Sequence, residues 1–298
     1  MEPRLTKTEL RYLMSMKFHV KESYTLGNKV IETMDEGEVF GDINGVFKMG
    51  GGNWLTKCED GSKKVDNRYI IETVEKDILP VDATGIILAD GTVKLRLFFQ
   101  TGLKKYDWLN HIIVVAMGTV VDGEYKLDAY TLESSSVWNS KAYFETPKLE
   151  HLYYVEVDVT DAMKAGKLAQ GSYMIIPITG GQFKGDKLNG KIENVGADWN
   201  VMNIKIPMTS NISTRYLLHT NDDAFISLIT DGRVNMTLKG IQAKKKGISD
   251  PVNSYFKQHL MFETADERYT WMNNELCVAT VQLGEGGRIC YDAYRIVK

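Results

Sequence analysis

Three ionisable side chains in the second half of the chain have the chemistry of acid–base catalysts. Asp198 is the carboxylate of a Gly-Ala-Asp-Trp motif, His219 ends an Arg-Tyr-Leu-Leu-His segment, and Glu263 follows an aromatic residue. A carboxyl group and an imidazole can take a proton from a bound molecule and return it elsewhere without an organic cofactor. We therefore predict Asp198, His219 and Glu263 as catalytic residues, with Asp198 and His219 as the acid and the base.

Neighbouring residues could hold the molecule on which these groups act. Arg215 would anchor a carboxylate or an oxyanion, and two tryptophans would form walls of the site. Structural alternatives stay open, because Asp and Asn both cap turns, a histidine in a strand can be hydrogen-bonded, and tryptophan often belongs to the core. The predicted ligand-binding residues are Trp199, Arg215, Tyr269, Trp271, Asn273, Asn53, Trp54 and Arg68.

These motifs occur twice in the chain, in the same order. Residues 68–73 (Arg-Tyr-Ile-Ile-Glu-Thr) return as 215–220 (Arg-Tyr-Leu-Leu-His-Thr), and 51–54 (Gly-Gly-Asn-Trp) return as 196–199. An ordered repeat of this kind indicates a tandem duplication in which each copy is a domain. The two copies therefore supply an internal comparison of residues at matching positions.

The copies differ at the predicted catalytic positions. The first copy carries Asn53, Gln100 and Glu72 where the second carries its three ionisable groups. Two carboxylates are thus replaced by amides, which form hydrogen bonds but do not exchange a proton. This difference favours the second copy as the chemically active half.

Each copy consists mainly of short runs of β-branched and aromatic residues separated by Gly, Asn and Asp. We predict an all-β fold in which each copy is an antiparallel meander of roughly eight to ten strands, closed into a barrel or a sandwich. The predicted domains are residues 1–132 and 149–298, with a linker at 133–148, and the two barrels are expected to pack as a pseudo-dimer. Alternate side chains share a strand face, but the sequence leaves open which face is interior.

Helices are predicted to be few and short. Residues 6–16 are expected to be partly helical, 161–165 to form one or two turns, and 265–274 to form a short helix with a counterpart at 103–111. An insertion at 237–253 has no partner in the first copy, and we predict a loop there that could act as a lid.

Composition and spacing exclude several classes of protein. The chain has 298 residues and a net charge of -3, which gives no electrostatic footprint for nucleic acid. The three cysteines and five histidines lack zinc-ligand spacing, and no motif for a nucleotide cofactor is present, so we predict neither a metal nor a cofactor. No signal peptide or membrane helix is recognisable, so a cytoplasmic protein without a membrane partner is expected. Homo-oligomerisation stays open.

The motifs together resemble the family catalogued as domain of unknown function 3237, also called UPF0311. They are found at 180–185 (Gly-Gly-Gln-Phe-Lys-Gly), 188–190 (Leu-Asn-Gly), 196–199 (Gly-Ala-Asp-Trp), 215–216 (Arg-Tyr), 262–264 (Phe-Glu-Thr) and 268–273 (Arg-Tyr-Thr-Trp-Met-Asn). The resemblance implies a closed or nearly closed antiparallel barrel of lipocalin-like or calycin-like character. It implies no reaction and no catalytic residue, and a tandem form is less usual in this family.

Two functional hypotheses from different classes follow. The first is a cofactor-independent enzyme that acts on a small apolar or aromatic molecule in a barrel by acid–base catalysis. Isomerase, cyclase, hydratase or lyase chemistry would fit, since each requires proton transfer only. The alternative is a non-catalytic protein that binds a small hydrophobic ligand in the same barrel. A barrel fold is compatible with both.

Overall fold

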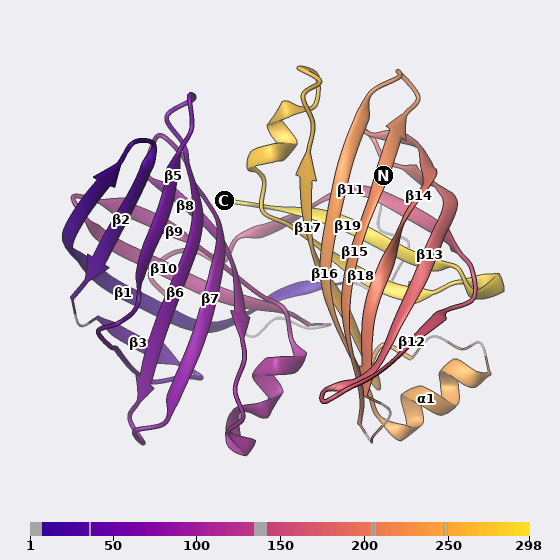
Figure 1. Ribbon diagram of the computed structural model, residues 1–298, viewed down its shortest axis with the longest axis horizontal. Coiled ribbons are helices and arrows are strands. Elements are labelled where there is room, and N and C mark those ends of the chain that lie inside the picture. The colour runs from indigo at the N-terminus through magenta and orange to yellow at the C-terminus, as the bar shows by residue number, and fades with distance from the viewer. Residues whose placement is uncertain are drawn as a thin grey trace. The chain divides into compact units, whose positions relative to one another are not determined.

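A computed structural model describes the chain except residues 1–7, 36, 134–141, 204, 206, 247 and 249. The chain divides into two compact units, one of residues 9–147 with Lys298 and one of 148–297 with Thr8, as far as these residues are described. Figure 1 shows the first unit in indigo to magenta and the second in magenta to yellow. Half of the predicted linker lies outside the described residues. The packing of the units as a pseudo-dimer stays a prediction.

The first unit is built from strands and one short 3₁₀ helix. Its strands carry alternating buried and exposed side chains, as in β6, because successive side chains point to opposite faces of a sheet. The elements are β1 (Glu9–Leu26), β2 (Lys29–Met34), β3 (Glu38–Gly41), β4 (Gly45–Phe47), β5 (Gly52–Lys57), β6 (Lys63–Thr73), β7 (Ile78–Ile87), β8 (Thr92–Phe99), η1 (Lys104–His111), β9 (Val114–Val121) and β10 (Glu124–Glu133).

The second unit repeats this plan with longer strands and one α-helix. Among the described residues, no helix is long and apolar enough to cross a membrane. The elements are β11 (Lys148–Val159), β12 (Met163–Leu168), β13 (Gly171–Lys184), β14 (Asn189–Asn203), β15 (Met208–Thr220), β16 (Phe225–Met236), α1 (Leu238–Lys245), β17 (Ser254–Glu263), η2 (Thr270–Asn274), β18 (Cys277–Leu283), η3 (Glu285–Gly287) and β19 (Ile289–Val297).

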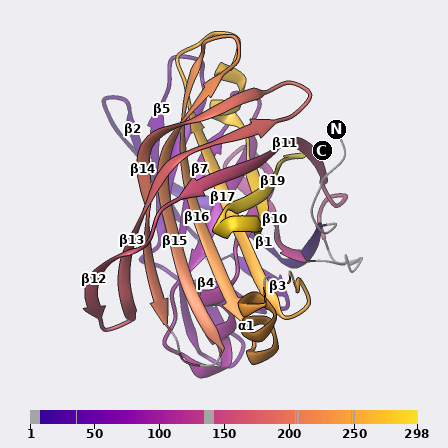
Figure 2. The ribbon, with the colours of Figure 1, turned by 90° about the vertical axis from the view of Figure 1, so that its right-hand side faces the viewer.

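Both sheets are antiparallel and close on themselves. The second sheet runs from β11 through β19, β18, β17, β16, β15 and β14 to β13, and β13 also pairs with β11. In the first sheet, β10 pairs with β1 to complete the circuit. Figure 2 shows the strands of the second unit wrapping around a common interior. The prediction of an all-β fold with two tandem barrels is confirmed.

Strand register confirms the alignment of the two copies. Arg68 pairs with Gly52 in the first barrel, and Arg215 pairs with Ala197 in the second. Trp54 likewise corresponds to Trp199, since they are paired with Ile31 and Ile175 respectively. Residues at these matching positions can therefore be compared directly.

Three local predictions are wrong. Within 6–16, residues 9–16 belong to β1, which pairs with β10 and β3. Residues 161–162 are irregular and β12 starts at Met163, so 161–165 form no helical turn. The insertion at 237–253 contains α1, which Thr237 caps by accepting a hydrogen bond from the backbone N–H of Gly240 at 3.2 Å. The helices expected at 103–111 and 265–274 are present as short 3₁₀ helices.

The register also identifies the interior face of each strand. In β15, Ile212, Thr214, Tyr216 and Leu218 are buried, whereas Arg215 is exposed. The face shared by Arg215, Leu217 and His219 is thus the outer face. This settles the alternative that the sequence left open.

We predict that Gly196 is required for the irregularity in β14, where the register of pairing with β15 shifts between Ile192 and Gly196. It has φ +99°, and a Cβ there would lie 1.8 Å from the carbonyl oxygen of Arg215. Gly166 has a similar φ of +108° with no atom within 4 Å. Gly166→Ala should therefore cost about 1–3 kcal/mol of strain alone. Gly196→Ala should cost at least about 2 kcal/mol more, because backbone must also shift. Urea unfolding measures both, and equal losses would refute the close-contact argument.

Candidate functional site

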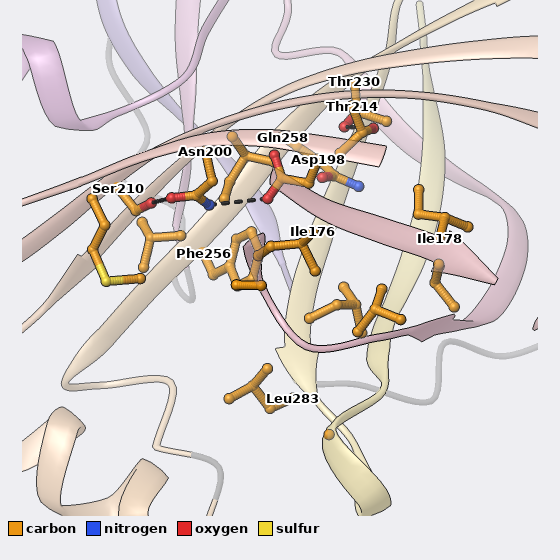
Figure 3. A pocket seen from close by; sticks show the side chains of 18 of the residues that line it. Ile176, Ile178, Asp198, Asn200, Ser210, Thr214, Thr230, Phe256, Gln258 and Leu283 are labelled. Carbon is orange, nitrogen blue, oxygen red and sulfur yellow. Dashed lines mark hydrogen bonds between the residues drawn. The ribbon is translucent and has the colours of Figure 1, made fainter. Parts of the chain in front are cut away.

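A cavity of about 310 Å³ lies within the second barrel. Figure 3 shows its lining, in which polar groups occupy one side and apolar side chains the rest. The apolar residues include Val157, Ile176, Ile178, Ile212, Val234, Phe256, Leu283 and Ile289. The polar residues include Asp198, Asn200, Ser210, Thr214, Thr230 and Gln258. A few polar groups on a mostly apolar wall are typical of a small-molecule site.

Asp198 is the carboxylate of this polar group. Its Oδ2 accepts a hydrogen bond from Asn200 Nδ2 at 3.0 Å, and its Oδ1 accepts from the backbone N–H of Ser213 at 3.1 Å. Ser210 in turn donates to Asn200 Oδ1, which completes the chain in Figure 3. Burial raises the pKa of Asp198 from 3.8 to about 6, against the opposing effect of these hydrogen bonds. Asp198 can therefore hold or release a proton near neutral pH.

Two pairs of hydroxyl groups complete the polar surface. Thr214 and Thr230, from adjacent strands, share a hydrogen bond of 2.7 Å. Tyr216 and Tyr291 also line the cavity, and their hydroxyls are hydrogen-bonded to each other. Burial raises the pKa of each tyrosine well above its ordinary value, so both stay protonated at neutral pH.

The first barrel fills the matching space with aromatic rings. Phe18 pairs with Tyr125 across β1 and β10, where the second barrel pairs Val157 with Ile289. The rings of Phe18 and Tyr125 stack with their centroids 4.7 Å apart, and Phe47 packs edge-on against Phe18 at 5.1 Å. Because protein interiors are close-packed, the smaller residues of the second barrel leave room that the aromatic rings take up in the first.

The first barrel also has a buried carboxylate, on the strand that pairs with β5. Glu32 is buried opposite Asn53, accepting hydrogen bonds from Asn53 Nδ2 at 2.9 Å and from Tyr125 at 3.0 Å. In the second barrel Ile176 lies opposite Asp198. Position 53 itself carries an amide, but the partner strand supplies a carboxylate beside it.

The structure separates the three predicted catalytic residues. Asp198 lines the cavity, whereas His219 lies on the outer face, where its Nδ1 contacts Glu193 at 2.7 Å and its Nε2 contacts Asp223 at 2.8 Å. The hydrogen bond to Asp223, and after it the one to Glu193, raise the pKa of His219. Glu263 is exposed at the end of β17. The prediction that these residues share one cavity is corrected by the alternation of faces along each strand.

The predicted ligand-binding residues are similarly dispersed. Arg215 is exposed, and Trp199 points away from the cavity because it follows Asp198 in β14. Trp54 and Arg68 line a shallow outer groove of the first barrel, with Arg68 3.1 Å from Asp82. Asn53 is buried and belongs to the polar network of Glu32 described above. None of these residues joins Asp198.

The remaining three lie in the segment that follows β17 and reaches η2. Asn273 donates to the carbonyl of Thr264 at 2.9 Å and accepts from its N–H at 3.0 Å, and Asn110 does the same to Thr101 in the first copy. Tyr269 donates to Asp222, and Trp271 lies beneath the guanidinium of Arg295 at 5.6 Å. This repeated motif holds a loop in place, which explains why it occurs in both copies.

Sequence reasoning missed most of the polar lining. Asn200, Thr230 and Gln258 replace the apolar residues Leu55, Ala83 and Leu95 at the matching positions of the first copy. Polar residues that replace apolar ones on a single face are a signal, but they can be recognised only once that face is known to be interior. The insertion adds Lys244 of α1 to the cavity lining. Across the described ranges, no three His, Cys, Asp or Glu side chains gather as metal ligands would.

Comparisons with known proteins match each half of the chain separately. A family described as "Protein of unknown function (DUF3237)" matches residues 8–132 and again 147–296. A UPF0311 protein of Rhodopseudomonas palustris is 27% identical over 155 residues, which is 51% of this chain and 99% of the relative. The predicted tandem duplication of this family is thereby confirmed.

Solved structures that are similar to the chain each cover about half of it. A "beta-barrel like protein" from Acinetobacter baumannii is 35% identical, covers 51% of this chain and 98% of its own, and has a TM-score of 0.45. A protein of unknown function from Clostridium acetobutylicum is 26% identical, covers 50% and 99%, and has a TM-score of 0.44.

We predict that the residues of the first barrel would close the cavity of the second. The double variant Val157→Phe, Ile289→Tyr should weaken binding of a fluorescent apolar dye at least about tenfold. It should unfold within a few degrees of the wild type, because the added rings fill existing space. Fluorescence titration and thermal melting measure the two effects. Unchanged dye binding would contradict the assignment of the cavity.

We also predict a pH-dependent gain in stability for Asp198→Asn. The folded protein holds a proton on Asp198 up to about pH 6, whereas the unfolded chain releases it near 3.8. Wild-type stability therefore falls as pH rises through this window, and the variant escapes that loss. The variant should be more stable by up to about 3 kcal/mol at pH 7 and equal to the wild type below pH 4. A variant that melts lower at pH 7 would give the carboxylate a structural role.

Proposed function

This chain belongs to the family described as protein of unknown function (DUF3237), and we propose that its second barrel is a cofactor-independent enzyme. In this proposal Asp198 transfers a proton to or from a small apolar or aromatic molecule held in the cavity. The observation that carries it is the carboxyl group of Asp198, with a pKa of about 6, inside a largely apolar cavity whose other carboxyl group, that of Asp161, is exposed. A catalytic acid or base works best when its pKa lies near the operating pH.

The surroundings of Asp198 support a role in proton transfer. Its hydrogen-bond donors, Asn200 and the backbone N–H of Ser213, fix the carboxyl group without neutralising its charge. A buried carboxylate paired with Arg or Lys would instead have a lowered pKa and would hold no proton near pH 6. Isomerase, cyclase, hydratase and lyase reactions all use such a group. His219, on the outer face, takes no part.

The lining indicates the class of substrate. A volume of about 310 Å³ is at the small end of known ligand sites, so a one- or two-ring molecule fits best. The walls formed by Val157, Ile178 and Phe256 favour an apolar body. Thr214 and Gln258 can orient a polar substituent near Asp198.

A second candidate is a binding protein without catalysis, and the largely apolar wall favours it. The two functions differ in one observable. An enzyme of this kind exchanges a proton between bound ligand and solvent, whereas a binding protein holds the ligand unchanged. Proton exchange can be followed before the physiological substrate is known.

We predict that the protein catalyses hydrogen–deuterium exchange in small carbonyl or phenolic compounds that bind in the second barrel. Ligands would be found by thermal shift and their exchange in D₂O followed by NMR. Asp198→Asn should slow exchange about 10²–10⁴-fold while leaving the dissociation constant within a few-fold. If Asp198 is the base, the rate should rise with pH through about 6, as the carboxyl group ionises.

The control is His219→Asn, which removes a titratable group from the outer face and should leave exchange unchanged. Ligands that bind in the cavity and exchange equally fast with and without Asp198 would refute the enzyme proposal. Ligands that bind without any exchange would support the binding protein.

A further inference from the structure

Three tyrosines of the second barrel form a chain of hydroxyl groups. Tyr153 of β11, Tyr291 of β19 and Tyr216 of β15 are all buried. The hydroxyls of Tyr153 and Tyr291 are 3.4 Å apart, and Tyr291 is hydrogen-bonded to Tyr216. Tyr216 and Tyr291 line the cavity. The chain thus ends at the cavity, on a tyrosine that can reach a bound molecule.

A count of protons gives this chain its chemical role. Three hydroxyls carry three protons, and the two hydrogen bonds between them use two. When Tyr153 donates to Tyr291 and Tyr291 to Tyr216, the proton of Tyr216 remains available to a ligand. An oxygen that carries negative charge would favour this direction, because hydrogen bonds to charged acceptors are stronger than neutral ones.

The chain lies beside Asp198. Asp198 pairs with Thr214 across β14 and β15, and Tyr216 follows two residues later on the same interior face. The backbones of diagonal neighbours of this kind are about 7–8 Å apart. Both residues line the same cavity, so one small molecule can place an oxygen at Tyr216 and the atom that gains or loses a proton at Asp198.

We propose that Tyr216 and Tyr291 form an oxyanion subsite, and that the substrates are molecules with an enolisable carbonyl or a phenolic oxygen. This inference rests on the proposed function, because Asp198 performs the proton transfer. The Asp198 carboxylate takes a proton from the carbon beside the carbonyl, and the C–H electron pair forms a C=C bond. The π pair of the carbonyl moves to oxygen, where Tyr216 donates a hydrogen bond. Where the substrate has a C=C bond next to the carbon that lost its proton, the enolate is conjugated with it, and return of the proton to the far carbon of that bond moves the double bond and gives an isomer without a change of oxidation state.

The tyrosines suit this task because they remain donors. Burial raises the pKa of Tyr216 and of Tyr291, so neither loses its proton to the ligand oxygen at neutral pH. The first barrel keeps Tyr69 at the position of Tyr216 but places Leu127 at that of Tyr291. Tyr69 there contacts Asn67 and Asn53 instead. The chain of hydroxyls therefore belongs to the barrel with the cavity.

The test compares 2-naphthol with naphthalene, which has the same ring system without the oxygen. For wild-type protein, Tyr216→Phe, Tyr291→Phe and Tyr153→Phe, the dissociation constants of both probes are measured by fluorescence titration. Tyr216→Phe should weaken binding of the ionised form of 2-naphthol at least about tenfold, the usual effect of losing a hydrogen bond to a charged group. Naphthalene should bind equally well to wild type and variant. Tyr153→Phe, which alters a residue outside the cavity lining, should have the smallest effect.

Asp198→Asn separates this inference from the proposed function. Loss of the neighbouring negative charge should strengthen binding of the naphtholate form, which the fluorescence of the ionised probe reports. If the affinity for 2-naphthol depends on Tyr216 but the rate of hydrogen–deuterium exchange does not depend on Asp198, the subsite is supported and the enzyme proposal fails. Equal weakening of both probes by Tyr216→Phe would make the tyrosine a packing residue and overturn the subsite. Failure of 2-naphthol to bind the wild type would overturn it as well.

Discussion

The pairing of β11 with β13 is the constraint on which the rest of the second barrel depends. It closes the antiparallel sheet, and closure gives every strand one interior and one exterior face. The interior has a fixed volume, so the size of each inward side chain determines whether that volume is filled or empty. Val157 and Ile289 line a cavity in the second barrel. At the matching positions of the first barrel, the rings of Phe18 and Tyr125 stack and fill the space. Two copies of one fold thus differ in whether the barrel interior holds a cavity, because the side chains at a few inward positions differ in size.

Polar groups in such an interior are costly unless they are hydrogen-bonded. The two copies satisfy this requirement differently. In the first barrel, Glu32 accepts hydrogen bonds from Asn53 and Tyr125 within a packed core. In the second, the carboxylate of Asp198 has fixed hydrogen-bond donors but still faces open space. The same requirement therefore gives a structural network in one barrel and a group available to a ligand in the other.

The motifs shared by both copies mainly maintain the fold. Asn110 and Asn273 bind the backbone of Thr101 and Thr264 in the same way, and the glycines at 51 and 196 lie over equivalent arginine carbonyls. Repetition was thus a guide to architecture, whereas cavity positions such as Val157, Asp198 and Ile289 differ between the copies. A site that arises after duplication is expected to show this pattern, because only one copy needs to change.

The sequence by itself determined the duplication, the all-β class and the chemical difference between the copies at position 198, because these depend on order, composition and local pattern. It could not determine which face of β15 is interior, since side chains alternate between the two faces and both faces carry apolar residues such as Tyr216 and Leu217. Arg215 and His219 were therefore placed with Asp198 although they lie outside. Only the tertiary structure brought Glu32 opposite Asn53 and Tyr291 beside Tyr216, because those contacts join strands far apart in the chain. The cavity could also be found only from the tertiary structure, since an empty volume depends on all the inward side chains together.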